Sequence, residues 1–188
     1  VLDAVRRLGE QASEAGRIVQ RIRAFLTRRA PQRERCHAAE AAQRAVALLR
    51  RDLQRLRIEV EWAVADDLPP VQADPVLIEQ VFINLVRNAA DELAASGTAA
   101  PRVRISATSA GERFVRLDVE DNGPGLQGRG IEQLSAPFYS TKPEGMGMGL
   151  AICRSVVEAH HGNMEASSSS LGGARLSFTL PVDPGEPS

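Results

Sequence analysis

The sequence reads DNGPG at residues 121–125 and GMGMGL at residues 145–150, two glycine-rich stretches about twenty residues apart. Apolar and polar residues alternate over residues 115–120, which predicts a strand with Asp121 on its apolar face. A carboxylate there is costly to bury unless it accepts hydrogen bonds, and the exocyclic amine of a ligand would be a suitable donor. The glycines after Asp121 allow the backbone to turn and to approach such a ligand.

The second stretch leads into a predicted helix over residues 149–161. Its apolar positions recur at helical spacing: Leu150, Cys153, Val156, Val157 and His160. Free N–H groups and the dipole at the start of a helix favour an anion such as a phosphate. Either stretch alone is compatible with an ordinary loop. Their order and spacing together favour a nucleotide site.

A third motif lies on a helix predicted from Asp74-Pro75 to about residue 96, because aspartate caps helices and proline suits their first position. One face is apolar, with Ile78, Phe82, Leu85, Ala89 and Leu93, and another carries Gln80, Asn84, Asn88 and Asp91. Asparagine is an indifferent helix former, so two in mid-helix need a reason. Amide oxygens suit Mg²⁺, which takes its other ligands from water and phosphates. The alternative is a polar surface stripe.

The rest of the chain alternates between predicted helices and strands. We expect a helix over residues 38–57, a strand over 58–64, a short strand over 71–73, a hairpin over 102–121 and a final strand pair over 163–170 and 174–181. In the strand 58–64, Ile58, Val60, Trp62 and Val64 form the apolar face, whereas residues 32–35 are interpreted as a polar linker.

The segment between the glycine-rich stretches is irregular and predicts a mobile lid with a short helix near residues 131–134. Phe138 is expected to dock this lid by burial, and Lys142 to bind an anion as a point charge. Residues 1–29 instead show a heptad seam, which requires a partner helix from a missing N-terminal part, a second copy or both. The alternative is an amphipathic helix that packs on its own domain.

Composition excludes several classes of protein. The net charge of −1 gives no reason to expect nucleic acid or an anionic membrane as partner, and no stretch is apolar enough to span a bilayer. The two cysteines, Cys36 and Cys153, are interpreted as reduced thiols, and Cys36-His37 is too small a set for a metal site. We therefore expect a cytoplasmic fragment, whose full-length parent is free to be membrane-anchored.

With these motifs placed, the chain resembles the sensor histidine kinases of two-component systems. Residues 84–89 (NLVRNA) resemble the family's asparagine box, 121–125 its first glycine box, 137–142 (PFYSTK) its phenylalanine box and 145–150 its second glycine box. The resemblance implies an ATP-binding domain over residues 31–188, an α/β two-layer sandwich of a mixed sheet and three main helices. Residues 1–30 resemble the second helix of the family's dimerisation hairpin. The closest likeness is to the nitrogen- and oxygen-sensing branch.

The same resemblance implies roles for single residues. Asn88 is expected to ligate Mg²⁺ and to act with Lys142 in catalysis, while Asp121 is expected to receive the amino group of adenine. Gly145, Gly147 and Gly149 are expected to shape the hinge of the lid. The remaining residues expected to bind the nucleotide are Asn84, Arg87, Asp91, Gly123, Gly125, Phe138 and Leu150.

One departure from the family concerns the histidine that accepts phosphate. The family carries it on the first helix of the hairpin, followed by an acidic residue, and none of His37, His160 and His161 meets that description. His160 and His161 end a helix, where an imidazole suits the helix dipole and a structural role is expected. We therefore expect the first helix to be missing and the acceptor to lie outside this chain.

The expected function is transfer of the ATP γ-phosphoryl group to that histidine, with Mg²⁺ as cofactor and with a second copy and a response regulator as partners. One alternative is a non-catalytic nucleotide-binding or dimerisation module. Another is an ATP hydrolase of the same superfamily, which needs a carboxylate four residues before the metal-binding asparagine. The residue at that position is Asn84, which cannot act as a base.

Overall fold

The computed structural model describes residues 31–139 and 147–185. The contacts within the chain divide it into residues 1–30 and residues 31–188, and the description below concerns the second unit. The predicted helix over residues 1–29 therefore lies outside the described residues, as do Lys142 and Gly145. Their expected roles stay predictions.

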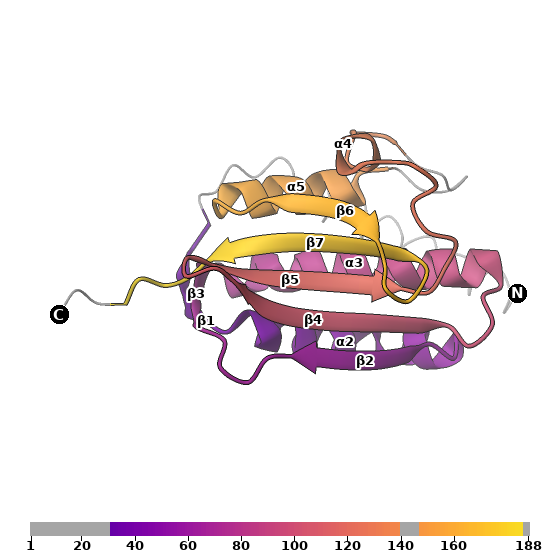
Figure 1. Ribbon diagram of the computed structural model, residues 1–188, viewed down its shortest axis with the longest axis horizontal. Helices are drawn as coiled ribbons and strands as arrows, with labels where there is room; N and C mark the ends of the chain where they lie inside the picture. The colour runs from indigo at the N-terminus through magenta and orange to yellow at the C-terminus, as the bar shows by residue number, and fades with distance from the viewer. Residues whose placement is uncertain (1–30, 140–146, 186–188) are drawn as a thin grey trace, which may run out of the picture. The chain divides into compact units, whose positions relative to one another are not determined.

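A five-stranded mixed sheet forms one layer of the described unit (Figure 1). Its strands, in spatial order, are β2 (Glu59–Val64), β4 (Arg102–Ala110), β5 (Phe114–Asp121), β7 (Ala174–Pro181) and β6 (Met164–Ser168). β2 and β4 are parallel and all other neighbours are antiparallel, so both hairpins predicted from the alternating pattern are confirmed.

The second layer consists of three helices on one face of this sheet: α2 (Ala38–Arg55), α3 (Pro75–Ser96) and α5 (Gly149–Ala159). A fourth helix, α4 (Ile131–Leu134), is a single turn next to α5 (Figure 1). The apolar faces of the strands and helices meet in one core, in which the rings of Phe82 and Phe178 pack edge to face with centroids 5.3 Å apart. The predicted α/β sandwich with three main helices is confirmed.

The ends of α3 follow from local sequence. The side chain of Asp74 accepts hydrogen bonds from the N–H groups of Val76 and Leu77, and Pro75 occupies the first helical position, as predicted. Gly97 ends the helix in the left-handed conformation, with φ of 61°, which glycine adopts without steric cost. These caps fix where α3 starts and therefore which of its turns lies beside the site.

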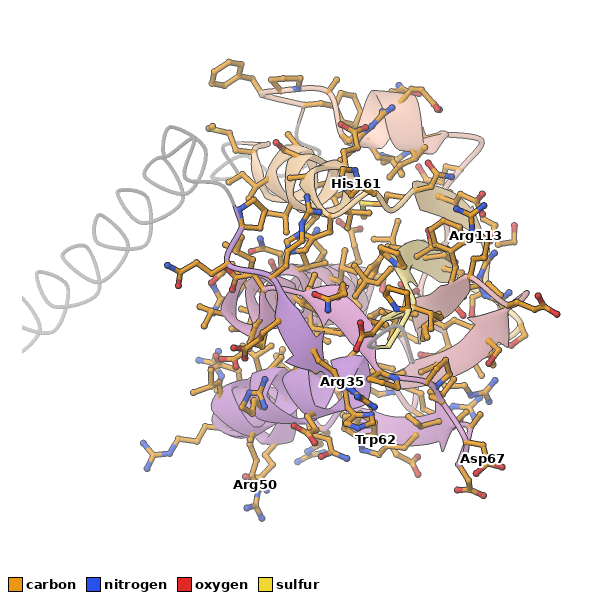
Figure 2. All side chains as sticks on the ribbon, turned by 90° about the vertical axis from the view of Figure 1, so that its left-hand side faces the viewer. Arg35, Arg50, Trp62, Asp67, Arg113 and His161 are labelled. Carbon is orange, nitrogen blue, oxygen red and sulfur yellow. The ribbon has the colours of Figure 1, made fainter. Side chains whose placement is uncertain are left out.

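Two features at the edges of the fold go beyond what the local sequence pattern indicated, and the linker prediction is wrong. Residues 32–35 are not merely a linker, because Glu34–Cys36 form the strand β1, which pairs antiparallel with β3 (Val71–Ala73). Trp62 lies on the predicted apolar face of β2 with Val60 and Val64, which pack against the core, but it is 43% exposed because β2 is the edge strand of the sheet. Figure 2 looks at the end of the sheet opposite to Asp121, where Asp67 and Arg113 lie, and it also labels Trp62 on the edge strand.

Three expectations from composition concern the described part of the chain. Cys36 and Cys153 are both thiols and form no disulfide, and burial raises the pKa of the Cys36 thiol. Among residues 31–139 and 147–185, no helix combines the length and the apolar character that crossing a membrane requires. The same residues contain no group of three histidine, cysteine or acidic side chains able to hold a metal ion.

Candidate nucleotide site

Asp121 ends β5 on the face that the helices cover, and it is only 7% exposed. Its Oδ1 accepts hydrogen bonds from the N–H groups of Gly123 (2.8 Å) and Ala174 (3.1 Å). No other described residue donates a hydrogen bond to its second oxygen, Oδ2. Burial raises the pKa of Asp121, the charge of Glu92 raises it further, and the two backbone donors only partly offset these effects. A ligand that donates to Oδ2 would therefore stabilise the ionised carboxylate.

The turn between β6 and β7 forms a wall of the site that was not predicted. A Cβ atom on Gly173 would overlap Oδ1 and the carbonyl oxygen of Asp121 and would lie 2.5 Å from the backbone nitrogen of Gly123. Gly125, with φ of 75°, lies against the same turn, where a Cβ atom would be 3.5 Å from the Gly173 oxygen. The sequence signal was the pair Gly172-Gly173 between two alternating strands.

Helices α3 and α5 run antiparallel (Figure 1), and two contacts fix how far they overlap. The Cys153 thiol lies 3.9 Å from the carbonyl oxygen of Val81, and Nε2 of His160 accepts a hydrogen bond of 2.9 Å from the Asp74 N–H. Each step forward along α5 thus corresponds to a step back along α3. The first turn of α5, which starts at Gly149 without a side-chain cap, therefore lies level with the asparagine motif of α3.

The two asparagines of α3 differ in burial. Asn84 is 4% exposed, so the surface-stripe interpretation is wrong at this position, whereas Asn88, one turn later, is half-buried. The Nδ2 atom of Asn84 is buried and has no hydrogen-bond partner among the described residues. An unsatisfied buried donor costs about 1–3 kcal/mol, so an acceptor supplied by a ligand or water would stabilise it. The end of α3 lies beside the glycine turn, because a Cβ atom on Gly123 would be 3.5 Å from a Cδ atom of Leu93.

The donor set beside α3 fits Mg²⁺, the cofactor that the family resemblance implies. Two neutral amides one turn apart cannot enclose a cation, and the described part of the chain adds no cluster of three acidic or imidazole ligands. Mg²⁺ keeps several waters and shares phosphate oxygens, so it needs only one or two protein ligands. Of the two amides, Asn88 is the one with access to solvent.

The described parts of the predicted lid correct one assignment. Phe138 is 76% exposed and has a left-handed φ of 66°, so it does not dock the lid by burial here. Gly147 lies instead against the backbone at Phe138 and Tyr139, because a Cβ atom on Gly147 would overlap both residues. Leu150 packs against the hydrophobic core. Arg87 is half-buried and Asp91 is exposed, both on the half of α3 that contains Asn88.

The three histidines lie far from the start of α5. His160 is fully buried, and burial lowers its pKa, so the neutral imidazole is favoured at this helix end. The predicted structural role is confirmed: Nδ1 lies 2.7 Å from the Val156 oxygen and Nε2 accepts from the Asp74 N–H, which ties α5 to α3. His161 and His37 are exposed.

Comparisons with known proteins agree with this geometry. Residues 73–184 match the family described as histidine kinase-, DNA gyrase B- and HSP90-like ATPases. The C4-dicarboxylate transport sensor protein DctS of Rhodobacter capsulatus is 36% identical over 95% of this chain and 27% of its own length. The sensor protein FixL of Bradyrhizobium diazoefficiens is 35% identical over 97% of this chain and 36% of its own length. The chain thus spans about a third of these relatives.

The fold is likewise that of solved kinase domains. The catalytic domain of histidine kinase ThkA superposes with a TM-score of 0.69 at 25% identity, over 80% of this chain and 96% of that domain. ThkA has also been solved in complex with the response regulator protein TrrA. Because the family match covers more than half of the residues, the chain belongs to the histidine kinase-, DNA gyrase B- and HSP90-like ATPases and contains the ATP-binding catalytic domain of a sensor histidine kinase.

Proposed function

We propose that this chain binds Mg·ATP and transfers the γ-phosphoryl group to a histidine outside its 188 residues, as part of two-component signalling. The observation that carries the proposal is the carboxylate of Asp121, which is buried and fixed by two backbone donors, while Oδ2 has no partner in the described part of the chain. The amino group of adenine is a donor that suits this oxygen. Guanine presents a carbonyl oxygen in the same place, so the site should select ATP over GTP.

The rest of the site provides for the phosphates. The first N–H groups of α5 have no partner within the helix and lie level with Asn84 and Asn88, so they are placed to bind phosphate oxygens. In this proposal Asn88 holds Mg²⁺, which neutralises phosphate charge when bound, and Asn84 donates its free amide N–H to an oxygen of the ligand. Arg87 and Lys142 are proposed to lie near the phosphates. Phosphoryl transfer requires mostly such positioning and charge neutralisation.

The histidines of this chain support an external acceptor. Both ring nitrogens of His160 are engaged in hydrogen bonds in the core, so this residue cannot attack ATP. His37 precedes α2, and His161 follows α5 at the end remote from its first turn. We propose that residues 1–30 are the second helix of a dimerisation hairpin whose first helix carries the acceptor. A response regulator, like the one solved with ThkA, would then receive the phosphoryl group.

The hydrolase alternative is weaker on structural grounds. A water attacking the γ-phosphate needs a base near it, and the position that the hydrolases fill with a carboxylate is Asn84. Its amide is buried and not ionisable. The site therefore offers a phosphate-binding group here, where a hydrolase would have a general base.

Labelling with γ-³²P-ATP tests the proposal. The 188 residues alone should bind ATP but acquire no covalent phosphate, whereas the chain extended by the residues that precede it in its parent protein should acquire an acid-labile, base-stable label on a histidine. Asn88→Ala in the extended chain is the control that should abolish the label. A label on His37, His160 or His161 of the short chain would contradict the proposal, as would ATP binding without label in the extended chain.

A further inference from the structure

Glu120 precedes Asp121 and points to the opposite face of the sheet, away from the helices, yet it is only 3% exposed. Its Oε2 accepts hydrogen bonds from the Ser169 hydroxyl (3.1 Å), the Ser170 N–H (3.0 Å) and the Ser170 hydroxyl (3.1 Å). Its Oε1 lies 3.1 Å from the guanidinium of Arg175. Burial by itself would raise the pKa of Glu120, but these donors outweigh it and lower the pKa, so the residue is ionised at neutral pH.

The residues that Glu120 holds form the first half of the β6–β7 turn. Within the turn, the Ser169 N–H donates to the Gly173 oxygen (2.8 Å) and the Gly172 N–H donates to the Ser169 oxygen (3.1 Å). The second half of the same turn reaches Asp121. The Gly173 N–H donates to the Asp121 carbonyl oxygen (3.2 Å), and the Ala174 N–H donates to Oδ1 of its side chain (3.1 Å).

We propose that Glu120 is a positioning residue for adenine recognition, because it clamps the turn at residues 169–173 whose far end orients the Asp121 carboxylate. The inference rests on the proposed function, in which Oδ2 of Asp121 receives the adenine amino group. Two adjacent residues of β5 thus contact the same turn. The Glu120 carboxylate holds the turn on the outer face of the sheet, and the same turn orients the Asp121 carboxylate on the inner face. Since the two N–H donors of Asp121 determine which oxygen faces the ligand, a loosened turn gives a misaligned acceptor.

Asp118 provides a matched control. It lies on the same strand and the same face as Glu120, is 5% exposed, and accepts hydrogen bonds from the hydroxyls of Ser106 and Ser177 and from Arg116. None of these partners belongs to the β6–β7 turn. Replacing either acid by its amide therefore removes a buried, hydrogen-bonded charge from the outer face, but only one replacement affects the turn that contacts Asp121.

The experiment compares Kd values for ATP and GTP, and thermal unfolding, in the 188-residue chain and in Glu120→Gln and Asp118→Asn. Glu120→Gln should weaken ATP binding about tenfold, which is the size of loss seen at metal sites when a residue that orients a ligating side chain is replaced. GTP binding should stay nearly unchanged, so the ATP/GTP preference should fall by the same factor. Both variants should lower the unfolding temperature by similar amounts, because each loses a buried, hydrogen-bonded charge. Asp118→Asn should nevertheless leave the ATP/GTP preference intact. A preference that stays the same in both variants would show that Glu120 serves stability alone and would overturn the inference.

Two further results keep the outcomes separable. If Glu120→Gln does not fold, Ser170→Ala removes one donor to Glu120 and keeps the backbone. It should shift the preference in the same direction by a smaller factor, and an unchanged preference would again overturn the inference. If the native chain binds ATP and GTP equally, the proposed function itself fails. An ATP-selective native chain with a selective Glu120→Gln variant rejects only the role of Glu120.

Discussion

Asp121→Asn is the substitution whose result follows most directly from the geometry. The N–H groups of Gly123 and Ala174 both point at Oδ1, at 2.8 and 3.1 Å, so this position can hold only an acceptor. The new amide must therefore place its oxygen there and its NH₂ group at the position of Oδ2. The acceptor proposed for the adenine amino group becomes a donor, and the size and backbone of the side chain do not change.

The magnitude follows from the bond that is lost. A hydrogen bond to a charged acceptor contributes about 1.5–3 kcal/mol, and each 1.4 kcal/mol corresponds to a factor of ten in Kd. We therefore expect ATP to bind about 10- to 150-fold more weakly. GTP should bind more tightly than to the native chain, because its carbonyl oxygen now meets a donor and no longer a carboxylate. The ATP/GTP preference should fall by more than the loss in ATP affinity.

Calorimetric titration of both nucleotides with Mg²⁺ measures all four affinities. Asp118→Asn is again the control, since it makes the same chemical change on the same strand without touching the site. Unchanged ATP affinity in Asp121→Asn would refute the assignment of the adenine acceptor. Equal loss of ATP and GTP would instead show that Asp121 maintains the shape of the glycine turn and does not read the base.

Three other substitutions test the rest of the site and the core contact by which His160 joins α5 to α3. Asn88→Ala should weaken ATP binding in the presence of Mg²⁺ by about tenfold or more and leave the unfolding temperature close to native. A lower unfolding temperature with unchanged ATP affinity would show that Asn88 is structural. Gly173→Ala should weaken ATP binding and destabilise the fold, because its Cβ overlaps Asp121, and unchanged affinity would separate the turn from the site. His160→Leu should cost about 2–4 kcal/mol of unfolding free energy in chemical denaturation, since it removes two buried hydrogen bonds. Because burial lowers the pKa of His160, the unfolded chain binds a proton that the folded chain does not, so native stability should fall as pH drops below about 6.5, and this part of the pH dependence should vanish in the variant.

Local sequence predicted the elements whose signals are local. The caps of α3 are a side chain and a glycine at its own ends, and the orientation of Asp121 follows from the period of two along β5. The strand β1 had no such signal. Two of its three residues, Glu34 and Arg35, are charged and exposed, and the segment forms a strand only because β3, more than thirty residues later, offers a partner. Such pairing depends on tertiary contacts that no local pattern reports.

Burial on the outer face of the sheet was hidden for a related reason. Period two shows that Asp118 and Glu120 face away from the helices, and on an uncovered sheet face this normally means exposure. Both are buried because arginines on the same face lie over them: Arg116, two residues earlier on β5, bonds Asp118, and Arg175 of the neighbouring strand β7 bonds Glu120. The alternation in a sequence predicts on which face of the sheet each residue lies. Whether that residue is buried depends on the side chains that lie beside it, and these are known only once the strands are placed.

The candidate site likewise combines local contacts with contacts between residues far apart in the sequence. Of the two donors to Asp121, the Gly123 N–H is two residues away within the glycine turn, whereas the Ala174 N–H is 53 residues away. The second donor depends on the register of β5 against β7, in which Glu120 lies opposite Arg175 and Val119 opposite Leu176. A slip of one residue would place Arg175 and Glu120 on opposite faces and remove Ala174 from Asp121. The Arg175–Glu120 ion pair on the outer face therefore favours the register in which the Ala174 N–H reaches Asp121 on the inner face. The carboxylate geometry proposed to recognise adenine thus depends on two charged side chains that do not contact the nucleotide.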